Sequence, residues 1–379
     1  MPLSRRNFVS ALGLGGVGLM SPPLLTGRGS EGRLAAWIRE SAAPASGLIR
    51  LDSNENPNGP SSRSIEALRA LLSEANRYPD ASEVPLMEAI ARAHGVSPEN
   101  VVLGAGSSET LRMCVEAFTS PTKHLVSAAP TFEPPGEFAK LLGRPVVAVP
   151  VDASLFLDLD AMAAAAVGAG LVFFCNPNNP TATVHGDAAV KGFIGRIRRT
   201  SPDTVILVDE AYHEYVDDRA YATAIPMAIA DPNVVVSRTF SKVFGMAGLR
   251  AGYAIAHADT ARRLQGWRLG SGISVLALGA ATAAVEDRAH IIEEQRKNRE
   301  AKAFTRAFFE RAGYKVGPSD TNFLMIDLRR DPQPVRVACR ENGLAVGRPF
   351  PPLDTWLRVS IGTMDEMQQA TAVFRKVLA

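Results

Sequence analysis

The sequence predicts an α/β protein built on a mainly parallel sheet. Between residues 101 and 269, apolar runs of strand length alternate with longer stretches of helical periodicity. This alternation is typical of a parallel sheet with helices on both faces. The run from Val205 to Val208 has no polar residue, as expected for a strand buried on both sides. At 379 residues, the chain is well over twice the ~150 residues typical of one domain, so we expect a large and a small domain.

The large domain is expected to contain a seven-stranded sheet. The strand candidates are short and rich in Val, Ile, Leu and Phe, the residues that favour strands. They lie at 101–103, 125–129, 146–149, 171–175, 205–208, 234–236 and 251–255. The helical patterns between them lie at 109–118, 134–142, 159–167, 188–199 and 260–269.

The rest of the chain predicts a smaller α+β domain joined through one long helical stretch. That stretch runs from 275 to about 311, and strand-like and helical segments follow it at 323–327, 334–341, 357–361 and 365–377. The expected division is a leader over 1–30, an N-terminal arm over 31–60, a large domain over 61–285 and a small domain over 286–379. Residues 61–75 are assigned to the large domain, with packing against the small domain as the alternative.

Composition and charge exclude several classes of protein. The chain has 41 Lys and Arg against 39 Asp and Glu, a net charge of 41 − 39 = +2. This balance is too even to attract nucleic acid or an anionic membrane by bulk charge. Cys114, Cys175 and Cys339 are odd in number and far apart, so we expect neither a disulfide framework nor a metal site.

The first residues resemble a twin-arginine export signal. Arg5 and Arg6 precede an uncharged apolar run over 8–20, and Ser21-Pro22-Pro23 follows. The run is shorter than the ~20 residues of a membrane-spanning helix. The resemblance implies export of the folded protein to the periplasm by the twin-arginine machinery. A leader without function, and so a cytoplasmic protein, is the alternative, and an uncleaved, membrane-tethered form stays open because no Ala-x-Ala lies between Met20 and Arg39.

Three motifs follow one another along the predicted sheet. They are Cys-Asn-Pro-Asn-Asn-Pro-Thr at 175–181, Asp-Glu-Ala-Tyr at 209–212, and Ser-Arg-Thr-Phe-Ser-Lys at 237–242 followed by Gly-Leu-Arg at 248–250. In this order, the chain from residue 48 to its end resembles the class I/II aminotransferases that use pyridoxal 5′-phosphate, most closely the histidinol-phosphate aminotransferase branch. The resemblance implies the aspartate-aminotransferase-like fold, called fold type I of the pyridoxal-phosphate enzymes.

Lys242 and Asp209 are the expected catalytic pair. Pyridoxal phosphate needs an amine that forms a Schiff base with its aldehyde, and a lysine in a crowded, cation-containing pocket loses its proton easily. Lys242 is that amine, and it would also move the proton between the substrate Cα and the cofactor C4′. The ring attracts electrons only while its nitrogen stays protonated, which requires an anion in a site of low dielectric constant. Asp209, at the end of a buried strand, is that anion.

Tyr212 and Asn179 resemble the family pair that hydrogen-bonds the phenolic oxygen of the cofactor. Tyr212 is therefore counted with the catalytic residues, and Asn179 with both the cofactor-binding and the substrate-binding residues. The family usually has Gly after this Pro-Thr, whereas this chain has Ala182, and alanine resists positive φ.

The cofactor phosphate needs backbone donors, hydroxyls and a cation. A glycine-rich turn opens a helix directly after the first predicted strand, so that its N–H groups can hold an anion. The residues expected at the phosphate are Ala105, Gly106, Ser107, Thr239, Ser241 and Arg250. By resemblance, Tyr78 reaches the phosphate of the neighbouring subunit, which implies a homodimer with shared active sites. The alternative for Tyr78 is a tyrosine that packs beside Pro79 in a turn.

Five further residues complete the expected site. Phe132 corresponds to the aromatic residue that stacks on the pyridine ring. Arg358 looks like the arginine that holds the substrate carboxylate with two parallel hydrogen bonds, and Arg348 is similar to a second family arginine near the distal end of the substrate. Asn54 and Asn56 of the arm are expected at the mouth of the pocket.

The resemblance implies amino transfer between an amino acid or amine and a 2-oxo acid such as 2-oxoglutarate. Histidinol phosphate is the named possibility for the amino compound, although Asn58 replaces the Tyr that is common in that branch. A decarboxylase or lyase on the same fold stays open, since the cofactor-binding residues do not decide which Cα bond breaks. A non-catalytic binding protein is the second alternative, but it would be expected to lack Lys242 or Asp209.

Overall fold

The structure is a computed structural model that describes residues 47–379. The predicted leader over 1–30 and the first part of the predicted arm lie outside the described residues. None of the helices within 47–379 is both long and apolar enough to cross a membrane.

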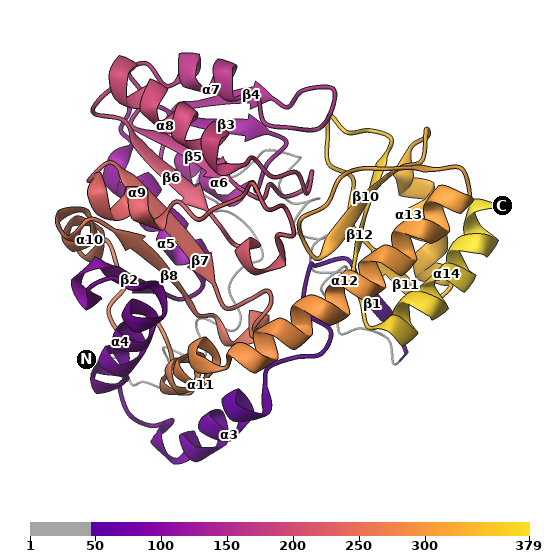
Figure 1. The fold of residues 1–379 in the computed structure, drawn as a ribbon, viewed down its shortest axis with the longest axis horizontal. Helices are drawn as coiled ribbons and strands as arrows, with labels where there is room; N and C mark the ends of the chain where they lie inside the picture. Colours follow the sequence, from indigo (N-terminus) through magenta and orange to yellow (C-terminus); the bar gives the residue numbers. More distant parts are fainter. Residues whose placement is uncertain (1–46) are drawn as a thin grey trace, which may run out of the picture. The chain divides into compact units, whose positions relative to one another are not determined.

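A seven-stranded sheet forms the centre of the larger part of the chain (Figure 1). Its strands run in the order β2-β8-β7-β6-β5-β3-β4, and all neighbours are parallel except β8, which is antiparallel to β2 and β7. The strands are β2 (Val101–Gly104), β3 (Leu125–Ala129), β4 (Val146–Pro150), β5 (Leu171–Cys175), β6 (Val205–Asp209), β7 (Val234–Thr239) and β8 (Gly252–Ala256). The sheet confirms the predicted fold class.

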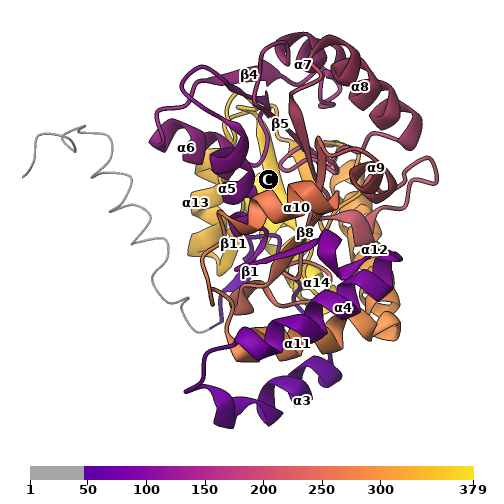
Figure 2. The ribbon, with the colours of Figure 1, turned by 90° about the vertical axis from the view of Figure 1, so that its left-hand side faces the viewer.

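Helices cover both faces of this sheet (Figures 1 and 2). They are α4 (Glu83–His94), α5 (Ser107–Phe118), α6 (Pro134–Leu141), α7 (Leu159–Ala165), α8 (Asp187–Thr200), α9 (Ile225–Ala230), α10 (Ala258–Gln265) and α11 (Val275–Glu286). Neighbouring strand residues point to opposite faces. Ile206 and Val208 of β6 therefore belong to the apolar cluster that contains residues of α4, α7, α8, α9 and α11, whereas Val205 and Leu207 belong to the cluster that contains residues of α5, α6 and α10. This double burial explains the unbroken apolar run of β6.

The predicted helical stretch over 275–311 consists of two helices, α11 and α12 (Arg288–Arg311), which meet at Asp287. Asp287 has the non-helical torsion angles φ −89° and ψ 67°, and its carboxylate accepts a hydrogen bond from the backbone N–H of His290. An Asp at such a position caps a new helix rather than continuing the old one. Helix α3 (Ser62–Ala70), which has no counterpart in the sequence prediction, packs against α11 (Figure 2).

The C-terminal part has its own sheet and apolar core. Its elements after α12 are β9 (Lys315–Val316), β10 (Phe323–Asp327), α13 (Pro332–Glu341), β11 (Leu344–Val346), β12 (Trp356–Ser360) and α14 (Met364–Leu378). An antiparallel sheet of order β12-β10-β9 packs with α12 and α14 around Phe309, Phe374 and Leu357. Strand β1 (Ile49–Leu51) pairs in parallel with β11. From residue 49 on, the arm therefore runs from the C-terminal part toward the large sheet.

Short 3-10 helices complete the described structure. They are η1 (Leu72–Glu74), η2 (Asp80–Ser82), η3 (Pro98–Asn100), η4 (His213–Tyr215) and η5 (Ala247–Leu249).

Candidate active site

A cavity of about 440 Å³ lies where β5, β6 and β7 end. Open α/β sheets bind ligands at the carboxyl ends of their strands, so the fold itself places the site here. The predicted site residues that line the cavity are Asn54, Ser107, Phe132, Asn179, Asp209, Tyr212, Thr239, Ser241, Lys242, Arg250, Arg348 and Arg358. Residues from the arm, both sheets and their connecting loops thus meet in one pocket.

Asp209 is a buried carboxylate with one oxygen free of partners. Burial is the main reason that the pKa of Asp209 rises to about 7, and the charge of Lys242 opposes this rise. The thiol of Cys175 lies 3.9 Å from Oδ2, while Oδ1 has no hydrogen-bond partner. A buried polar atom without a partner usually marks a ligand or an unseen water. Asp209 can therefore accept a hydrogen bond from a protonated ring nitrogen in the pocket.

Lys242 follows the end of β7 and is partly buried. Its Nζ donates a hydrogen bond of 3.0 Å to the carbonyl oxygen of Asn54 on the arm. Burial, and then the positive charge of Arg358, lower the pKa of Lys242 to about 8. The amine can therefore lose its proton near neutral pH, which a nucleophile requires.

Tyr212 and Asn179 each have one group engaged and one group left for a ligand. The Tyr212 hydroxyl accepts a hydrogen bond of 3.1 Å from Asn54 Nδ2, so its own proton can be donated. Asn179 Oδ1 accepts a hydrogen bond of 2.8 Å from Arg358 Nη1, and its amide N–H groups remain donors. Both side chains can thus donate to one oxygen atom of a bound ring.

The loop before α5 and Arg250 form the anion-binding end of the pocket. Gly106 has φ +77°, which other residues rarely adopt, and a Cβ atom there would lie 2.2 Å from Arg250 Nη2, so that a larger residue would also displace this guanidinium. Arg250 also donates to Ser241 Oγ at 3.3 Å and to Ser108 Oγ at 3.4 Å. With the N-terminus of α5 alongside, these groups can hold a phosphate.

Sequence reasoning missed the residue that shapes this loop. Glu109 is buried, and its carboxylate accepts hydrogen bonds from the backbone N–H of Ala105 at 2.6 Å and of Leu269 at 2.9 Å. The available signal was a glutamate that closely follows the glycine-rich turn at 104–106. Ala105 and Gly106 therefore support the loop, while Ser107 and Ser108 line the cavity itself.

Arg358 and Arg348 lie on the ring of Phe350, with guanidinium carbons 4.6 and 4.4 Å from the ring centre. Arg358 is buried, and its Nε has no partner. Arg348 is half exposed at the mouth, where it forms an ion pair with Glu133 from the start of α6. Beside Phe350 the pocket thus offers two guanidinium groups to a substrate, and the carboxylate of Glu133 competes for the outer one.

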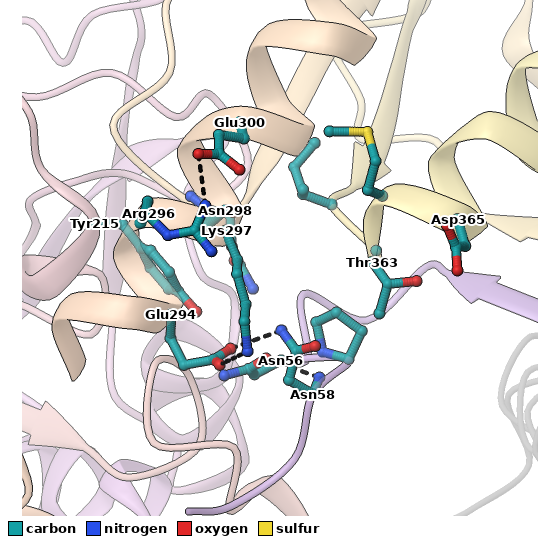
Figure 3. Close-up of a pocket in the computed structure, with 15 residues that line it drawn as sticks. Asn56, Asn58, Tyr215, Glu294, Arg296, Lys297, Asn298, Glu300, Thr363 and Asp365 are labelled. Carbon is teal, nitrogen blue, oxygen red and sulfur yellow. Dashed lines mark hydrogen bonds and ion pairs between the residues drawn. The ribbon is translucent and has the colours of Figure 1, made fainter. Parts of the chain in front are cut away.

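Asn56 differs from its predicted position at the mouth of the pocket. Its Nδ2 donates to the carbonyl oxygen of Val243 at 2.8 Å, and its side chain lines a second cavity of about 280 Å³ (Figure 3). There Asn58 Nδ2 donates to Glu294 Oε2 at 2.7 Å, and Lys297 bonds the other oxygen of Glu294 at 2.9 Å. These bonds fix the arm on α12, and Asn58 is not part of the active-site lining.

The backbone conformation of Ala182 and the exposure of Tyr78 bear on two further expectations from the sequence. Ala182 adopts φ +63° while fully buried, so the turn keeps the left-handed backbone for which the family uses glycine, at a cost of about 1 kcal/mol. Tyr78 is 86% exposed and does not line the pocket of its own chain.

A family model described as "Aminotransferase class I and II" matches residues 46–374. The chain belongs to this family. The "Histidinol-phosphate aminotransferase" of Moorella thermoacetica is 38% identical over 336 residues, which cover 88% of this chain and 86% of that protein. The protein of the same name from Symbiobacterium thermophilum is 36% identical and covers 87% and 91%.

Solved structures agree with this membership. The histidinol-phosphate aminotransferase of Sinorhizobium meliloti, solved with pyridoxal 5′-phosphate, has a TM-score of 0.83 and 27% identity and covers 91% of this chain and 94% of that chain. The L-threonine-O-3-phosphate decarboxylase of Porphyromonas gingivalis has a TM-score of 0.74 and 19% identity and covers 87% and 99%, which shows a shared fold alone. The chain is thus an aminotransferase, a transferase that depends on pyridoxal phosphate.

The pocket of this aminotransferase fits that cofactor. The free, buried Oδ1 of Asp209 suits a protonated ring nitrogen, the amine of Lys242 suits the aldehyde, and the cation and hydroxyls around Arg250 suit the phosphate. Within residues 47–379, no cluster of three or more His, Cys, Asp or Glu side chains could hold a metal ion.

The lowered pKa of Lys242 predicts how cofactor attachment depends on pH. Only the neutral amine attacks an aldehyde. At pH values below the pKa, the neutral fraction increases about tenfold for each unit by which the pH rises. For a pKa of about 8 rather than the usual 10.5, attachment to the apoenzyme should speed up as pH rises to about 8 and level off above it. Stopped-flow absorbance of apoenzyme mixed with pyridoxal phosphate measures this rate; a rise that continues to pH 10 would contradict the lowered pKa.

Proposed function

We propose that this aminotransferase exchanges an amino group between the glutamate/2-oxoglutarate couple and histidinol phosphate or a similar amino compound. The observation that carries the proposal is the pair of guanidinium groups, Arg348 and Arg358, on one aromatic ring in the pocket. Glutamate and 2-oxoglutarate carry two carboxylates, which suit two such cations. The names of the curated relatives support histidinol phosphate.

Five polar side chains of the pocket have defined tasks in this reaction. When bound, pyridoxal phosphate supplies the electron sink for the carbanion at the substrate Cα. Lys242 holds the cofactor and then moves the proton between the substrate Cα and the cofactor C4′, Asp209 keeps the ring nitrogen protonated, and Tyr212 and Asn179 donate to the phenolic oxygen. Arg358 orients the substrate by its carboxylate.

Other residues of the pocket would complete the cofactor site. Phe132 would stack on the pyridine ring, and Ser107, Thr239, Ser241 and Arg250 would hold the phosphate together with the loop at Ala105 and Gly106.

Assays with a panel of amino donors test which amino compound the enzyme uses. The purified enzyme with 2-oxoglutarate should form glutamate from histidinol phosphate faster than from any common amino acid. Asn58 favours the competing candidate, a donor without phosphate. This residue replaces the Tyr that is common in the histidinol-phosphate branch, and its side chain is bound to Glu294 outside the active-site lining. Faster turnover of an amino acid than of histidinol phosphate would establish that competitor, and CO₂ release without amino exchange would indicate a decarboxylase.

The mouth of the pocket predicts a selective effect of Glu133→Gln. This change frees Arg348 from its partner, and an exposed ion pair of this kind contributes about 0.2–1 kcal/mol. The KM for 2-oxoglutarate should therefore fall by a factor of about 1.4 to 5, while the KM for an amino acid with an uncharged side chain stays the same. Glu137→Gln, at another carboxylate of the same lining, is the matched control. An equal change in both KM values would contradict the role of Glu133.

The active unit is a homodimer with shared active sites. Large apolar side chains of two contacting segments are exposed, namely Leu72, Tyr78, Val84, Trp267 and Leu269. The segments are joined by the ion pair of Arg268 with Glu83 and by a hydrogen bond of 2.8 Å from Ser271 to Asp80. Such a patch suits a second copy of the chain, whose Tyr78 would reach the phosphate end of the pocket.

Subunit mixing tests this arrangement. Light scattering should give the mass of a dimer, and mixed Lys242→Ala and Tyr78→Ala subunits should recover activity that neither variant has alone. A monomeric active enzyme would contradict it.

The leader over 1–30 directs the folded protein to the periplasm through the twin-arginine machinery. The pair Arg5-Arg6 before the apolar run supports this. Replacement of both arginines by lysine should retain the protein in the cytoplasm, as measured by cell fractionation. Unchanged fractionation would show that the leader has no export function.

A further inference from the structure

A buried ion pair lies directly behind the residues that line the active-site pocket. Glu210 follows Asp209 in the chain, and Arg238 precedes Thr239 on β7. Because neighbouring residues of extended chain point to opposite sides, Asp209 and Thr239 face the pocket, whereas Glu210 and Arg238 are outside its lining. Only 1% of Glu210 and 2% of Arg238 are exposed.

The pair is fully hydrogen-bonded. Arg238 Nε and Nη2 lie 2.9 and 2.6 Å from Glu210 Oε2. The Thr223 hydroxyl donates to the same oxygen at 2.7 Å and accepts from Arg238 Nη2 at 3.0 Å. The backbone N–H of Ala224 donates to Glu210 Oε1 at 2.6 Å, and Arg238 Nη1 lies 3.4 Å from a second carboxylate, that of Glu214. The guanidinium thus uses all three nitrogens, and both oxygens of Glu210 have donors.

These bonds join the two chain segments that carry the reactive groups. Glu210 lies in the turn after β6, between Asp209 and Tyr212, and its backbone N–H also donates to the carbonyl oxygen of Ser237 on β7 at 2.9 Å. Lys242 belongs to the chain that follows β7. The placement of Asp209 and Tyr212 relative to Lys242 therefore depends on how the ends of β6 and β7 are held together.

A buried ion pair contributes little net stability, because the loss of hydration offsets the attraction between the charges. Its geometric effect can be larger, since a planar guanidinium bonds a carboxylate in one orientation. We propose that Arg238 and Glu210 are positioning residues, which hold Asp209 and Tyr212 in place relative to Lys242. The proposal rests on the aminotransferase function but not on the choice of substrate, because neither side chain lines the pocket.

Arg238→Lys tests the proposal in the cofactor-loaded enzyme. Lysine keeps the charge but lacks the planar fork, so the reacting groups should shift. We expect kcat per bound cofactor to fall by about tenfold or more, the KM for the amino donor to stay within about twofold because no substrate contact is lost, and the visible absorption band of the cofactor to move. Glu210→Gln should act in the same direction. Arg296→Lys, at a half-exposed arginine with two carboxylate partners on α12, should change none of these.

Thr223→Val keeps both charges and removes only the hydroxyl that bridges them, so it tests the proposal even if the other variants fail to fold. Its kcat should fall in the same direction but by less, and its absorption band should also move. Thermal unfolding is measured on every variant. The proposal is overturned if Thr223→Val and every folded variant at Arg238 or Glu210 keep the wild-type band and a kcat within about twofold, with only the unfolding temperature lowered.

Discussion

Replacement of Lys242 by alanine is expected to abolish both amino transfer and covalent attachment of the cofactor. The variant loses the amine that holds the aldehyde and the base that moves the Cα proton, so turnover should fall by about 10⁴-fold or more. The visible absorption of the attached cofactor should disappear from the purified protein. Absorbance spectra and steady-state assays with 2-oxoglutarate measure both effects.

The fold should survive this change. The amine of Lys242 is buried with one hydrogen bond, to the Asn54 carbonyl oxygen, and burial of a charged amine is unfavourable. Cofactor-free Lys242→Ala should therefore unfold at the same temperature as the wild-type apoenzyme or higher. Lys191→Ala, at an exposed lysine of α8, should keep full activity. Residual amino transfer by Lys242→Ala within tenfold of wild type would refute the assignment.

Asp209→Asn should slow the reaction by a factor of about 10²–10³, the usual effect of removing one preorganised electrostatic contact. Asparagine fills the same volume but carries no charge, so the ring nitrogen would lose the anion that keeps it protonated. The rate of Cα proton removal, measured with a donor deuterated at that carbon, should become the slow step. Cofactor affinity should weaken as well.

Asp160→Asn, at an exposed aspartate of α7, is the matched control and should behave as wild type. A normal rate of proton removal in Asp209→Asn would show that the ring nitrogen has another partner. The pKa of Asp209 is raised to about 7 in the absence of a ligand. Cofactor binding should lower this pKa, because the positive charge of the protonated ring nitrogen stabilises the ionised carboxylate.

The strands and the chemical motifs could be predicted from the sequence because their signals are local. The run Val205 to Val208 is buried on both faces of β6, and such burial leaves an unbroken apolar pattern. The three motifs meet because parallel strands end at one edge of the sheet. For this reason the pocket contains most of the residues expected from the sequence.

Other features depend on contacts that are distant in sequence. Asn54 bonds Tyr212 and Lys242, which are 158 and 188 positions away, and no periodic pattern reports such pairs. Glu133 and Arg348 meet only because the fold brings the start of α6 and the C-terminal part to the same pocket. The break at Asp287 was missed because helical periodicity continues on both sides of the cap.

The contact between Glu210 and Arg238 could not be predicted from the sequence for the same reason. Both residues stand inside motifs whose neighbours carry the chemistry, so the sequence directs attention to Asp209 and Lys242 instead. Their burial and mutual contact become visible only once β6 and β7 are placed side by side.

The most direct measurement is to reduce the cofactor-loaded enzyme with borohydride, digest it and locate the modified residue by mass spectrometry. Reduction makes the bond between cofactor and amine permanent, so the phosphopyridoxyl group should be found on the peptide that contains Lys242 and on no other. A label on a different lysine, or a protein that remains unlabelled when supplied with pyridoxal phosphate, would contradict the active site described above.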